Sequence, residues 1–221
     1  MRRCKKVAKV RIAGTIVSND DKWIYDWFGI DAFCINDLYK NIKSENEELD
    51  IEINSPGGDV FSGSEIYTAV KNHKGRKVVS ITGLAASSAS VIAMAGDVVK
   101  MSPTAQMMIH NVSAVGSGDY RDMEHLSTVL RQANEVIANA YMIKTGKSKE
   151  ELLSLMDSEK WFTPQEAKEQ GFIDEIMFNE NGNLQLVACF KPNIIPAQII
   201  DKMRMEKEQE ILNILKLKEI Q

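Results

Sequence analysis

Leu-Asp-Ile-Glu-Ile-Asn-Ser-Pro-Gly-Gly, residues 49–58, is an alternating apolar run that ends in a proline and two glycines. The alternation over Leu49–Ile53 predicts a short β-strand, and the proline and glycines predict a turn after it. The next segment, Phe61–Asn72, carries apolar residues on one side of a predicted helix, and Val78–Thr82 predicts another strand. This order of strand, helix and strand favours an α/β fold.

The same alternation extends in both directions from this stretch. Towards the N-terminus, Val7–Val17 predicts a strand and Asp31–Lys43 a helix. Towards the C-terminus, Ser87–Ala95 predicts a short helix, and strands at Val98–Met101 and Met107–Ile109 follow. We therefore expect an α/β layered fold with mainly parallel strands, in which ligands bind at the carboxyl ends of the strands.

The longest predicted helix runs from Tyr120 to Thr145, where apolar residues recur at three- and four-residue steps before Gly146. A helix of ~7 turns is too long for one small layer. We expect it to project from the body and pack on another subunit, although it could instead fold along its own domain.

The C-terminal part carries two helix-start signals and then changes character. Ser148–Glu151 and Thr163–Glu166 are capping boxes, and each of them opens a helix. Beyond them, 184–190 predicts a late strand and 199–220 a charged amphipathic helix. The last segment is expected to be an appendage.

Composition argues against several classes of function. The formal net charge is -4 at pH 7, so the chain has no broad basic field for a nucleic-acid backbone. Its cysteines, Cys4, Cys34 and Cys189, lie far apart without C-x-x-C spacing, which indicates neither a zinc site nor a disulfide framework. No apolar run approaches the ~20 residues that span a bilayer, and the N-terminus lacks the apolar stretch of a signal peptide. We expect a cytoplasmic protein with no nucleic-acid or membrane partner.

A cluster of small residues, Gly83–Ser90, follows one predicted strand and opens a helix. This arrangement puts a serine hydroxyl at a helix N-terminus, where free N–H groups and the helix dipole favour a developing negative charge. Taken alone, such a cluster is more often an N-cap or a place of tight helix packing.

The segment Asn54–Gly58 is a second loop at a strand end, and its glycines can present a backbone N–H with no side chain in the way. In isolation such a loop is more often an ordinary turn. Together with the N–H of Ser88, the N–H of Gly58 could hold a tetrahedral oxyanion. Each such donor is typically worth ~3 kcal/mol of transition-state stabilisation.

A serine nucleophile needs a general base, and histidine is the side chain with a suitable pKa. Two of the three histidines, His73 and His125, lie in charged stretches and are expected on the surface. His110 instead ends the apolar strand Met107–Ile109, at the strand edge where catalytic groups of α/β folds collect. A single such histidine is more often structural, but its coincidence with the two loops favours a catalytic base.

These motifs, in this order, resemble the signature of the Clp protease proteolytic subunit family, peptidase S14. The resemblance covers roughly Val7 to Ile176 and rests on Asn54–Gly58, Gly83–Ser87, Met108–His110 and Phe162–Asp174. It implies a ClpP/crotonase-like layered fold of repeated β-β-α units with a projecting long helix. It also implies a serine endopeptidase without a metal or other cofactor. The catalytic domain is then expected over residues 1–178, and a C-terminal strand and helical appendage over 179–221.

Within that family, the chain is most similar to the phage and prophage branch, the Clp-related head maturation proteases. This similarity rests on Gly83–Ser87, Val91–Asp97 and Trp161–Thr163. It implies that the substrates are phage capsid or scaffold proteins, which are processed during assembly.

The resemblance implies a role for each candidate site residue. Ser87 takes the position of the nucleophile and His110 that of the general base. The N–H groups of Gly58 and Ser88 take the positions of the oxyanion-hole donors.

The third member of the triad is less clear. The family places an aspartate where this chain has Glu159, and we expect Glu159 to orient the imidazole of His110. Asp157, two residues away, has the family's residue type and is the alternative. Glu159 could also be a solvated surface acid.

The partners implied by the resemblance are a polypeptide substrate and further copies of the chain. The family forms rings of seven, single or double, and works with a Clp ATPase. After His110 it carries a Gln-Pro and glycine-rich segment that helps to join two rings, whereas this chain has the shorter Asn111–Gly118. Met1–Lys6 is shorter and more basic than the family's axial loops. Ring stacking and docking to an ATPase therefore stay open.

Three other functions fit parts of the pattern. A relative of signal peptide peptidases would share the layered fold but pair Ser87 with a buried lysine, which leaves His110 without a role. A crotonase-like acyl-CoA enzyme would share a loop like Asn54–Gly58, but this chain has no acidic residue in the second loop. A non-catalytic assembly or scaffolding protein would keep the fold without the chemistry.

Overall fold

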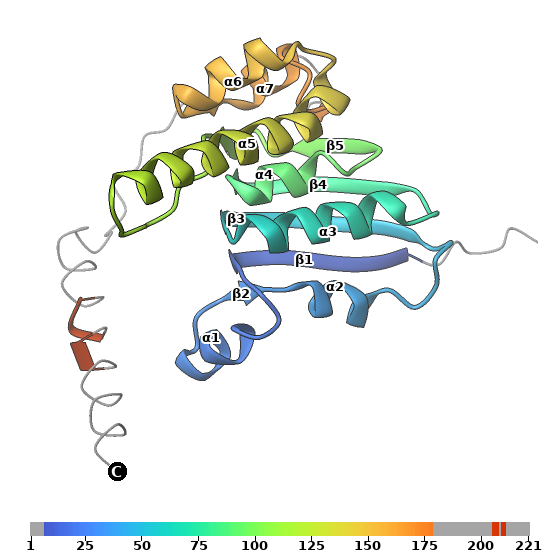
Figure 1. Cartoon of the computed structure of the whole chain (residues 1–221). Coiled ribbons are helices and arrows are strands. Elements are labelled where there is room, and N and C mark those ends of the chain that lie inside the picture. The colour runs from blue at the N-terminus through green and yellow to red at the C-terminus, as the bar shows by residue number, and fades with distance from the viewer. Residues whose placement is uncertain (1–6, 179–204, 208, 211–221) are drawn as a thin grey trace, which may run out of the picture. The chain divides into compact units, whose positions relative to one another are not determined.

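The computed structural model describes residues 7–178, 205–207 and 209–210 (Figure 1). The late strand predicted at 184–190 lies outside the described residues. Of the helical tail predicted at 199–220, the five described residues at 205–207 and 209–210 are helical.

The chain separates into two compact units, Met1–Glu180 and Asn181–Gln221, and the first contains a mixed sheet (Figure 1). In the described residues this sheet has eight strands in the order β2-β1-β3-β4-β5-β8, with β6 paired to β4 and β7 to β6. The strands are β1 (Val7–Ile16), β2 (Ala32–Phe33), β3 (Glu48–Gly58), β4 (Lys77–Ala86), β5 (Val98–Met101), β6 (Gln106–Ile109), β7 (Lys160–Phe162) and β8 (Glu175–Ile176). All pairs are parallel except β6 with β7, which confirms the predicted α/β class with mainly parallel strands.

The labelled helices are α1 (Lys22–Phe28), α2 (Ile35–Asn41), α3 (Val60–Asn72), α4 (Ser88–Ala93), α5 (Tyr120–Thr145), α6 (Lys149–Asp157) and α7 (Pro164–Glu169).

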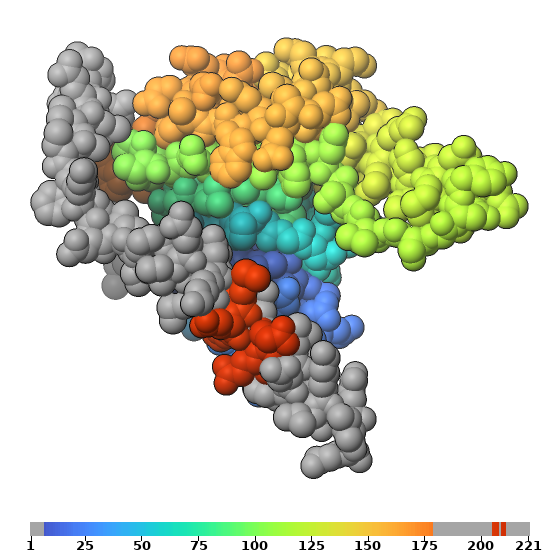
Figure 2. Space-filling model, turned by 90° about the vertical axis from the view of Figure 1, so that its left-hand side faces the viewer, coloured from blue at the N-terminus to red at the C-terminus, as the bar shows by residue number. Residues whose placement is uncertain are grey.

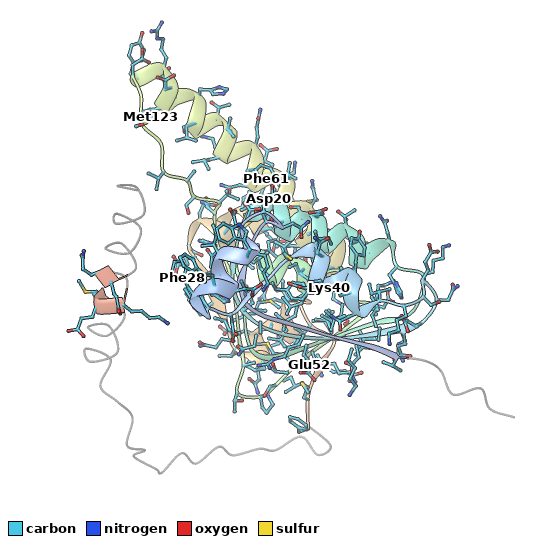
Figure 3. The ribbon with its side chains drawn as sticks, turned by 90° about the horizontal axis from the view of Figure 1, so that it is seen from below. Asp20, Phe28, Lys40, Glu52, Phe61 and Met123 are labelled. Carbon is cyan, nitrogen blue, oxygen red and sulfur yellow. The ribbon has the colours of Figure 1, made fainter. Side chains whose placement is uncertain are left out.

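Along β3, buried and exposed residues alternate over most of the strand, and Glu52 is one of the exposed residues. Figure 3 shows Glu52 on the side of the sheet away from α1 and α2. Within the described residues, helices therefore cover one face of β3 and leave the other open. None of the described helices is long and apolar enough to cross a bilayer.

The strand β2 and the helix α2 lie where the sequence predicted a single helix. The helix predicted over 31–43 begins only at Ile35, because Ala32–Phe33 pairs with β1 as the strand β2. The helix α1 is not predicted by the pattern. The helix has only seven residues, Lys22–Phe28, and none of them is buried.

The glycine-containing segments after the predicted strands are strands as well, so the prediction of a turn at Asn54–Gly58 is wrong. β3 continues through Gly58 because β1 keeps pairing with it beyond a bulge, with Ile16 opposite Gly58. β4 continues to Ala86 because it pairs with β6 over residues 84–86 after its pairing with β5 ends. The carboxyl ends of β3, β4 and β6 therefore meet at one edge of the sheet.

The helix α5 packs against the helices α4 and α6, and its buried residues all lie in its C-terminal half. It starts at Asp119, whose carboxylate accepts from backbone N–H groups of the first turn, and it ends at Gly146, which has φ 71°. Its buried residues are Ile137, Ala138, Ala140 and Tyr141. Figure 2 shows the N-terminal half extending away from the body, and Figure 3 shows Met123 near its tip. The expected projecting helix is thus confirmed.

Both predicted capping boxes are present and set the starts of α6 and α7. Ser148 Oγ accepts a hydrogen bond from Glu151 N–H, and Thr163 Oγ1 accepts one from Glu166 N–H, both at 3.2 Å. Between these helices the chain passes through β7, which lies alongside β6. The capping boxes therefore bracket the segment in which the candidate acids lie.

Candidate active site

Ser87 lies at the junction of β4 and α4, where its backbone is held in an uncommon conformation. Its φ is 55° and its ψ is -130°, and a positive φ is costly for a residue that has a β-carbon. The Ser87 N–H donates to Met108 O on β6 at 3.0 Å, and the Ser87 C=O accepts from Ser90 N–H at 2.9 Å. These bonds hold the turn against its strain.

His110 directly follows β6, and its Nε2 lies 2.8 Å from Ser87 Oγ. The two side chains meet because β4 and β6 are paired neighbours that both end at this edge of the sheet. With the ring proton on Nδ1, Nε2 can accept the hydroxyl proton, as a general base must. The structure therefore brings together the serine and the histidine that the sequence singled out.

A pocket of about 80 Å³ lies at this pair, and both Ser87 and His110 line it. Its apolar lining consists of Val60, Val91, Val112, Ile137 and Tyr141. A pocket of this kind beside a nucleophile can receive an apolar side chain of a substrate while a few polar groups fix the reacting atoms.

The two residues expected to form an oxyanion hole line the same pocket. Ser88 is the first residue of α4, so its N–H has no acceptor within the helix. Gly58 is the last residue of β3. Amide donors at these places can stabilise a negative oxygen on a carbon bonded to Ser87 Oγ.

Two glycines let β3 approach its neighbours closely at this point. Gly57 has φ 92°, and a β-carbon there would lie 2.6 Å from Ala86 O. Gly58 has φ 152°, and a β-carbon there would lie 2.1 Å from Ile16 O. Any side chain at either position would force the backbone apart, so the spacing of the site depends on both glycines.

The two acids considered for the third position of the triad have other partners. Glu159 Oε1 accepts a hydrogen bond from Trp161 Nε1 at 3.3 Å, and Asp157 Oδ1 accepts one from Asn111 Nδ2 at 2.7 Å. Within the part of the chain that the structure describes, the second ring nitrogen of His110 makes no hydrogen bond. Neither acid is therefore paired with the imidazole in this conformation.

Glu159 lies closer along the backbone to the strand pair that carries His110 than Asp157 does. β6 and β7 are antiparallel, with Ile109 opposite Lys160. His110 directly follows β6 and Glu159 directly precedes β7, so the two residues flank the last pair of this ladder. Glu159 also has a positive φ of 47°, and such outliers in non-glycine residues cluster at functional sites.

The apolar pattern does not single out a pair of buried hydroxyls beside Ser87. Ser90 Oγ lies 2.6 Å from Ser87 O and 2.7 Å from Tyr141 Oη. Tyr141 belongs to the predicted apolar stripe of α5, and its ring does pack edge-on against Phe172. Burial raises the pKa of Tyr141, so the phenol stays protonated. A tyrosine within an otherwise aliphatic stripe is the only sequence signal of this pair, and it is a weak one.

The other two histidines lie away from this site. His73 was expected on the surface, but it is buried, and its Nε2 lies 2.7 Å from Glu47 O at the start of β3. This is the amino edge of the parallel strands, opposite to the edge that carries Ser87. His125 is exposed on α5, as expected. Among the described residues, no group of three His, Cys, Asp or Glu side chains could hold a metal ion.

The chain is similar in sequence to a known family of proteins. The family model described as Clp protease matches residues 32–180. An ATP-dependent Clp protease proteolytic subunit from Bacteroides fragilis is 30% identical over 167 residues, which are 72% of this chain and 81% of the relative. The corresponding subunit from Deinococcus radiodurans is 32% identical over 140 residues, 62% of this chain and 69% of the relative. Subunit 2 from Nocardia farcinica is 33% identical over 154 residues, 67% of this chain and 74% of the relative.

Proposed function

Because the chain belongs to the Clp protease family and is a serine peptidase, we propose that it cleaves peptide bonds with Ser87 as nucleophile and His110 as general base. The observation that carries this proposal is the 2.8 Å distance from Ser87 Oγ to His110 Nε2. A serine hydroxyl is a weak nucleophile at neutral pH unless such a base takes its proton. The positive φ of Ser87, at a strand-to-helix turn, supports the same role.

In the first half of the reaction, Ser87 Oγ attacks the carbonyl carbon of the peptide bond and its proton passes to His110 Nε2. The carbonyl oxygen becomes an oxyanion, which accepts hydrogen bonds from the N–H groups of Gly58 and Ser88. The C–N bond then breaks, the imidazolium gives its proton to the departing amine, and an ester on Ser87 remains. In the second half, His110 deprotonates a water molecule that hydrolyses this ester and restores the serine.

We assign Glu159 as the residue that orients His110. Its carboxylate would accept from Nδ1, hold the tautomer whose Nε2 faces Ser87, and stabilise the imidazolium formed during acylation. The β6–β7 register supports this assignment. Since the carboxylate contacts Trp161 in this structure, its side chain must exchange that bond for one to the imidazole.

Labelling with a fluorophosphonate followed by peptide mapping tests the nucleophile. The expected result is one modified residue, Ser87, with no labelling of Ser87→Ala and strongly slowed labelling of His110→Ala. Because the two residues act as a unit, the double variant should hydrolyse peptides little more slowly than either single one. Modification of Ser88 or Ser90, or peptide turnover by Ser87→Ala at the wild-type rate, would contradict the assignment.

We further propose that the chain acts as a homo-oligomeric ring, which the resemblance puts at seven subunits. The support is the exposed apolar surface of α5, to which Val129, Val136 and Ile143 contribute. Apolar surface that the chain itself does not cover is typical of a protein interface.

As substrate we propose a phage capsid or scaffold polypeptide. The support is the likeness of Val91–Asp97 and Trp161–Thr163 to the head maturation branch. Incubation with purified capsid precursor, with Ser87→Ala as control, should produce new termini without ATP. Cleavage of short peptides but not of capsid precursor would contradict this substrate and leave the peptidase activity in place.

A serine–lysine peptidase and a non-catalytic scaffold are the alternatives. The first is disfavoured because the partner of Ser87 Oγ is His110, and no lysine lines the pocket among the described residues. The second would leave Ser87 unlabelled by the fluorophosphonate.

A further inference from the structure

A chain of hydrogen-bonded groups runs from α5 to the backbone of Ser87. Tyr141 Oη lies 2.7 Å from Ser90 Oγ, and Ser90 Oγ lies 2.6 Å from Ser87 O. Ser90 is 0% exposed and Tyr141 is 1% exposed, so water does not compete for these bonds. In a buried setting, each of these hydroxyls needs the partner it has.

The direction of each hydrogen bond in this series follows from the number of protons that the three groups carry. Ser90 has one hydroxyl proton, and the Ser87 carbonyl has none, so the bond between them uses the proton of Ser90. Ser90 Oγ can then only accept from Tyr141 Oη. The hydrogen bonds therefore run from Tyr141 through Ser90 to the Ser87 carbonyl, and each donor polarises the next.

The acceptor at the end of this chain is one half of a catalytic peptide group. The Ser87 C=O and the Ser88 N–H belong to the same planar trans peptide and point in opposite directions. Fixing the carbonyl therefore fixes the direction of the Ser88 N–H, and Ser88 lines the pocket beside Ser87. The same carbonyl also accepts from the Ser90 N–H at 2.9 Å and from the Val91 N–H at 3.4 Å, so rotation of this peptide group would break all three bonds.

We propose that Tyr141 and Ser90 are positioning residues that hold the Ser87–Ser88 peptide group with its N–H directed at the oxyanion. This inference rests on the proposed function, in which Ser87 is the nucleophile and the Ser88 N–H an oxyanion-hole donor. Polarisation of the Ser87 carbonyl by Ser90 also strengthens the Ser88 N–H as a donor, because both belong to one conjugated amide.

The geometry lets the tyrosine hydroxyl be tested without moving its ring. The ring of Tyr141 packs edge-on against Phe172 at 5.8 Å between centroids, and Phe172 packs on Phe162 of β7 at 4.8 Å. Tyr141→Phe keeps these contacts and removes one oxygen. The ring then stays in place, while Ser90 loses the donor that supports it.

Steady-state kinetics with a peptide ester, together with inhibition by a peptide aldehyde, form the test. The aldehyde forms a tetrahedral adduct with Ser87 and places an oxygen in the proposed hole. For Tyr141→Phe we expect kcat to fall about 3–10-fold with KM nearly unchanged, the size of effect of one neutral hydrogen bond. The inhibition constant of the aldehyde should rise by the same factor. Ser90→Ala, which removes the bond to the carbonyl itself, should lower kcat by at least about tenfold.

The double variant separates a relay from two independent contacts. If the tyrosine hydroxyl acts only through Ser90, adding Tyr141→Phe to Ser90→Ala should not lower kcat further. The matched control is Tyr67→Phe on α3. Tyr67 is half-buried, and its hydroxyl makes no hydrogen bond within the described residues. This substitution should leave kcat, KM and aldehyde inhibition unchanged.

A purely structural role predicts a different set of results. Tyr141→Phe would then lower the melting temperature, while kcat per fluorophosphonate-titrated site and aldehyde inhibition would equal those of the wild type. That outcome, or additive effects of the two substitutions on kcat, would overturn the inference alone, since turnover would still depend on Ser87. A wild-type protein without Ser87-dependent hydrolysis would overturn the proposed function and this inference with it. If Ser90→Ala does not fold, the kcat and aldehyde inhibition of Tyr141→Phe decide the question.

Discussion

Gly57 and Ser87 lie so close together that a β-carbon on Gly57 would fall 2.7 Å from the β-carbon of Ser87. Gly57 also has φ 92°, a conformation that residues with a β-carbon rarely adopt. The end of β3 and the turn that carries the nucleophile are thus in backbone contact. Only glycine at position 57 permits this contact.

We predict that Gly57→Ala lowers kcat/KM by at least about 100-fold. The added methyl group must displace the turn at Ser87, and misplacement of a catalytic group by ~1 Å can cost a factor of this size. The variant should also unfold at a lower temperature than the wild type. Peptide ester kinetics, normalised to fluorophosphonate-titrated sites, and thermal unfolding measure the two effects.

Gly29→Ala is the matched control for backbone strain. Gly29 ends α1 with φ 63°, but no heavy atom lies within 4 Å of a β-carbon placed there. Its substitution should therefore cost only the ~1–2 kcal/mol of a left-handed conformation and leave turnover unchanged. Equal turnover of the two variants would show that the contact between Gly57 and Ser87 is not needed for catalysis.

The fold class was predictable because the apolar periodicity of each strand and helix is visible locally in the sequence. The ends of the strands were not, because they depend on pairing with strands that are distant in the sequence. The apolar alternation of β3 and the helical stripe of α3 are visible within a few residues of sequence. The extension of β3 through Gly58 is not, because it results from pairing with β1, some forty residues away in the sequence. The helix α1 was missed for another reason: it has only seven residues, too few for a repeating helical stripe to show.

The site shows the same division. Ser87 and His110 each end a strand next to an apolar run, so their positions at the sheet edge could be predicted. The hydrogen bonds of Tyr141 and Ser90 could not, because the pattern of an apolar stripe describes the tyrosine by its ring and not by its hydroxyl. The orientation of Glu159 depends on its positive φ and on its contact with Trp161, and residue type alone determines neither.

The exposed apolar residues of α5 predict that the protein is an oligomer in solution. Val136 is 64% exposed and Ile143 is 66% exposed. Multi-angle light scattering at micromolar concentration should give a mass several times the 24.8 kDa of one chain. Val136→Glu should shift the mass downwards, because an interface core excludes an unpaired charge.

Asn72→Asp, which adds the same charge at an exposed polar position at the end of α3, should leave the mass unchanged. A stable wild-type monomer would count against the proposed ring, since a standard interface buries on the order of 1,600 Å² and holds subunits together at this concentration.

Acid sensitivity should depend on Glu166 in the capping box of α7. A hydrogen bond from Thr163 N–H, followed by bonds from Lys160 and Thr163 Oγ1, lowers the pKa of Glu166 from 4.5 to about 2. As the pH falls, the unfolded chain takes up this proton before the folded chain does. The contribution of Glu166 to stability is therefore complete above about pH 4.5 and is lost as the pH falls towards 2.

Urea unfolding over a series of pH values measures this contribution. Glu166→Gln should be less stable than the wild type at pH 7, and its stability should fall less steeply between pH 4.5 and 2. Glu169→Gln makes the same change at another acid of α7. The carboxylate of Glu169 has no hydrogen bond or ion pair within the described residues. If the pH profile of Glu166→Gln matches that of Glu169→Gln and of the wild type, the capping box does not act on acid stability.

The identity of the third triad residue can be decided by two isosteric substitutions. Glu159 directly precedes β7, whose first residue pairs with the one before His110, whereas Asp157 already accepts a hydrogen bond from Asn111 at 2.7 Å. We therefore predict that Glu159→Gln cuts turnover of a peptide ester by up to ~10⁴-fold with little change in KM, because an amide that donates to Nδ1 forces the wrong imidazole tautomer. Asp157→Asn should stay near the wild-type rate, since it changes only the contact with Asn111.

Each alternative outcome assigns the role elsewhere. If Asp157→Asn abolishes turnover while Glu159→Gln does not, the strand register is a poor guide and Asp157 must leave Asn111 to reach the imidazole. If neither substitution lowers turnover, His110 is oriented by a backbone carbonyl or by water. Its Nδ1 has no hydrogen-bond partner among the described residues, so one of these would have to supply it. If Glu159→Gln alone is inactive, the carboxylate must turn from Trp161 to His110 in the active state.

Trp161→Phe, which removes the competing donor, should then raise the rate of fluorophosphonate labelling, because Glu159 no longer has to break that bond before it orients the base.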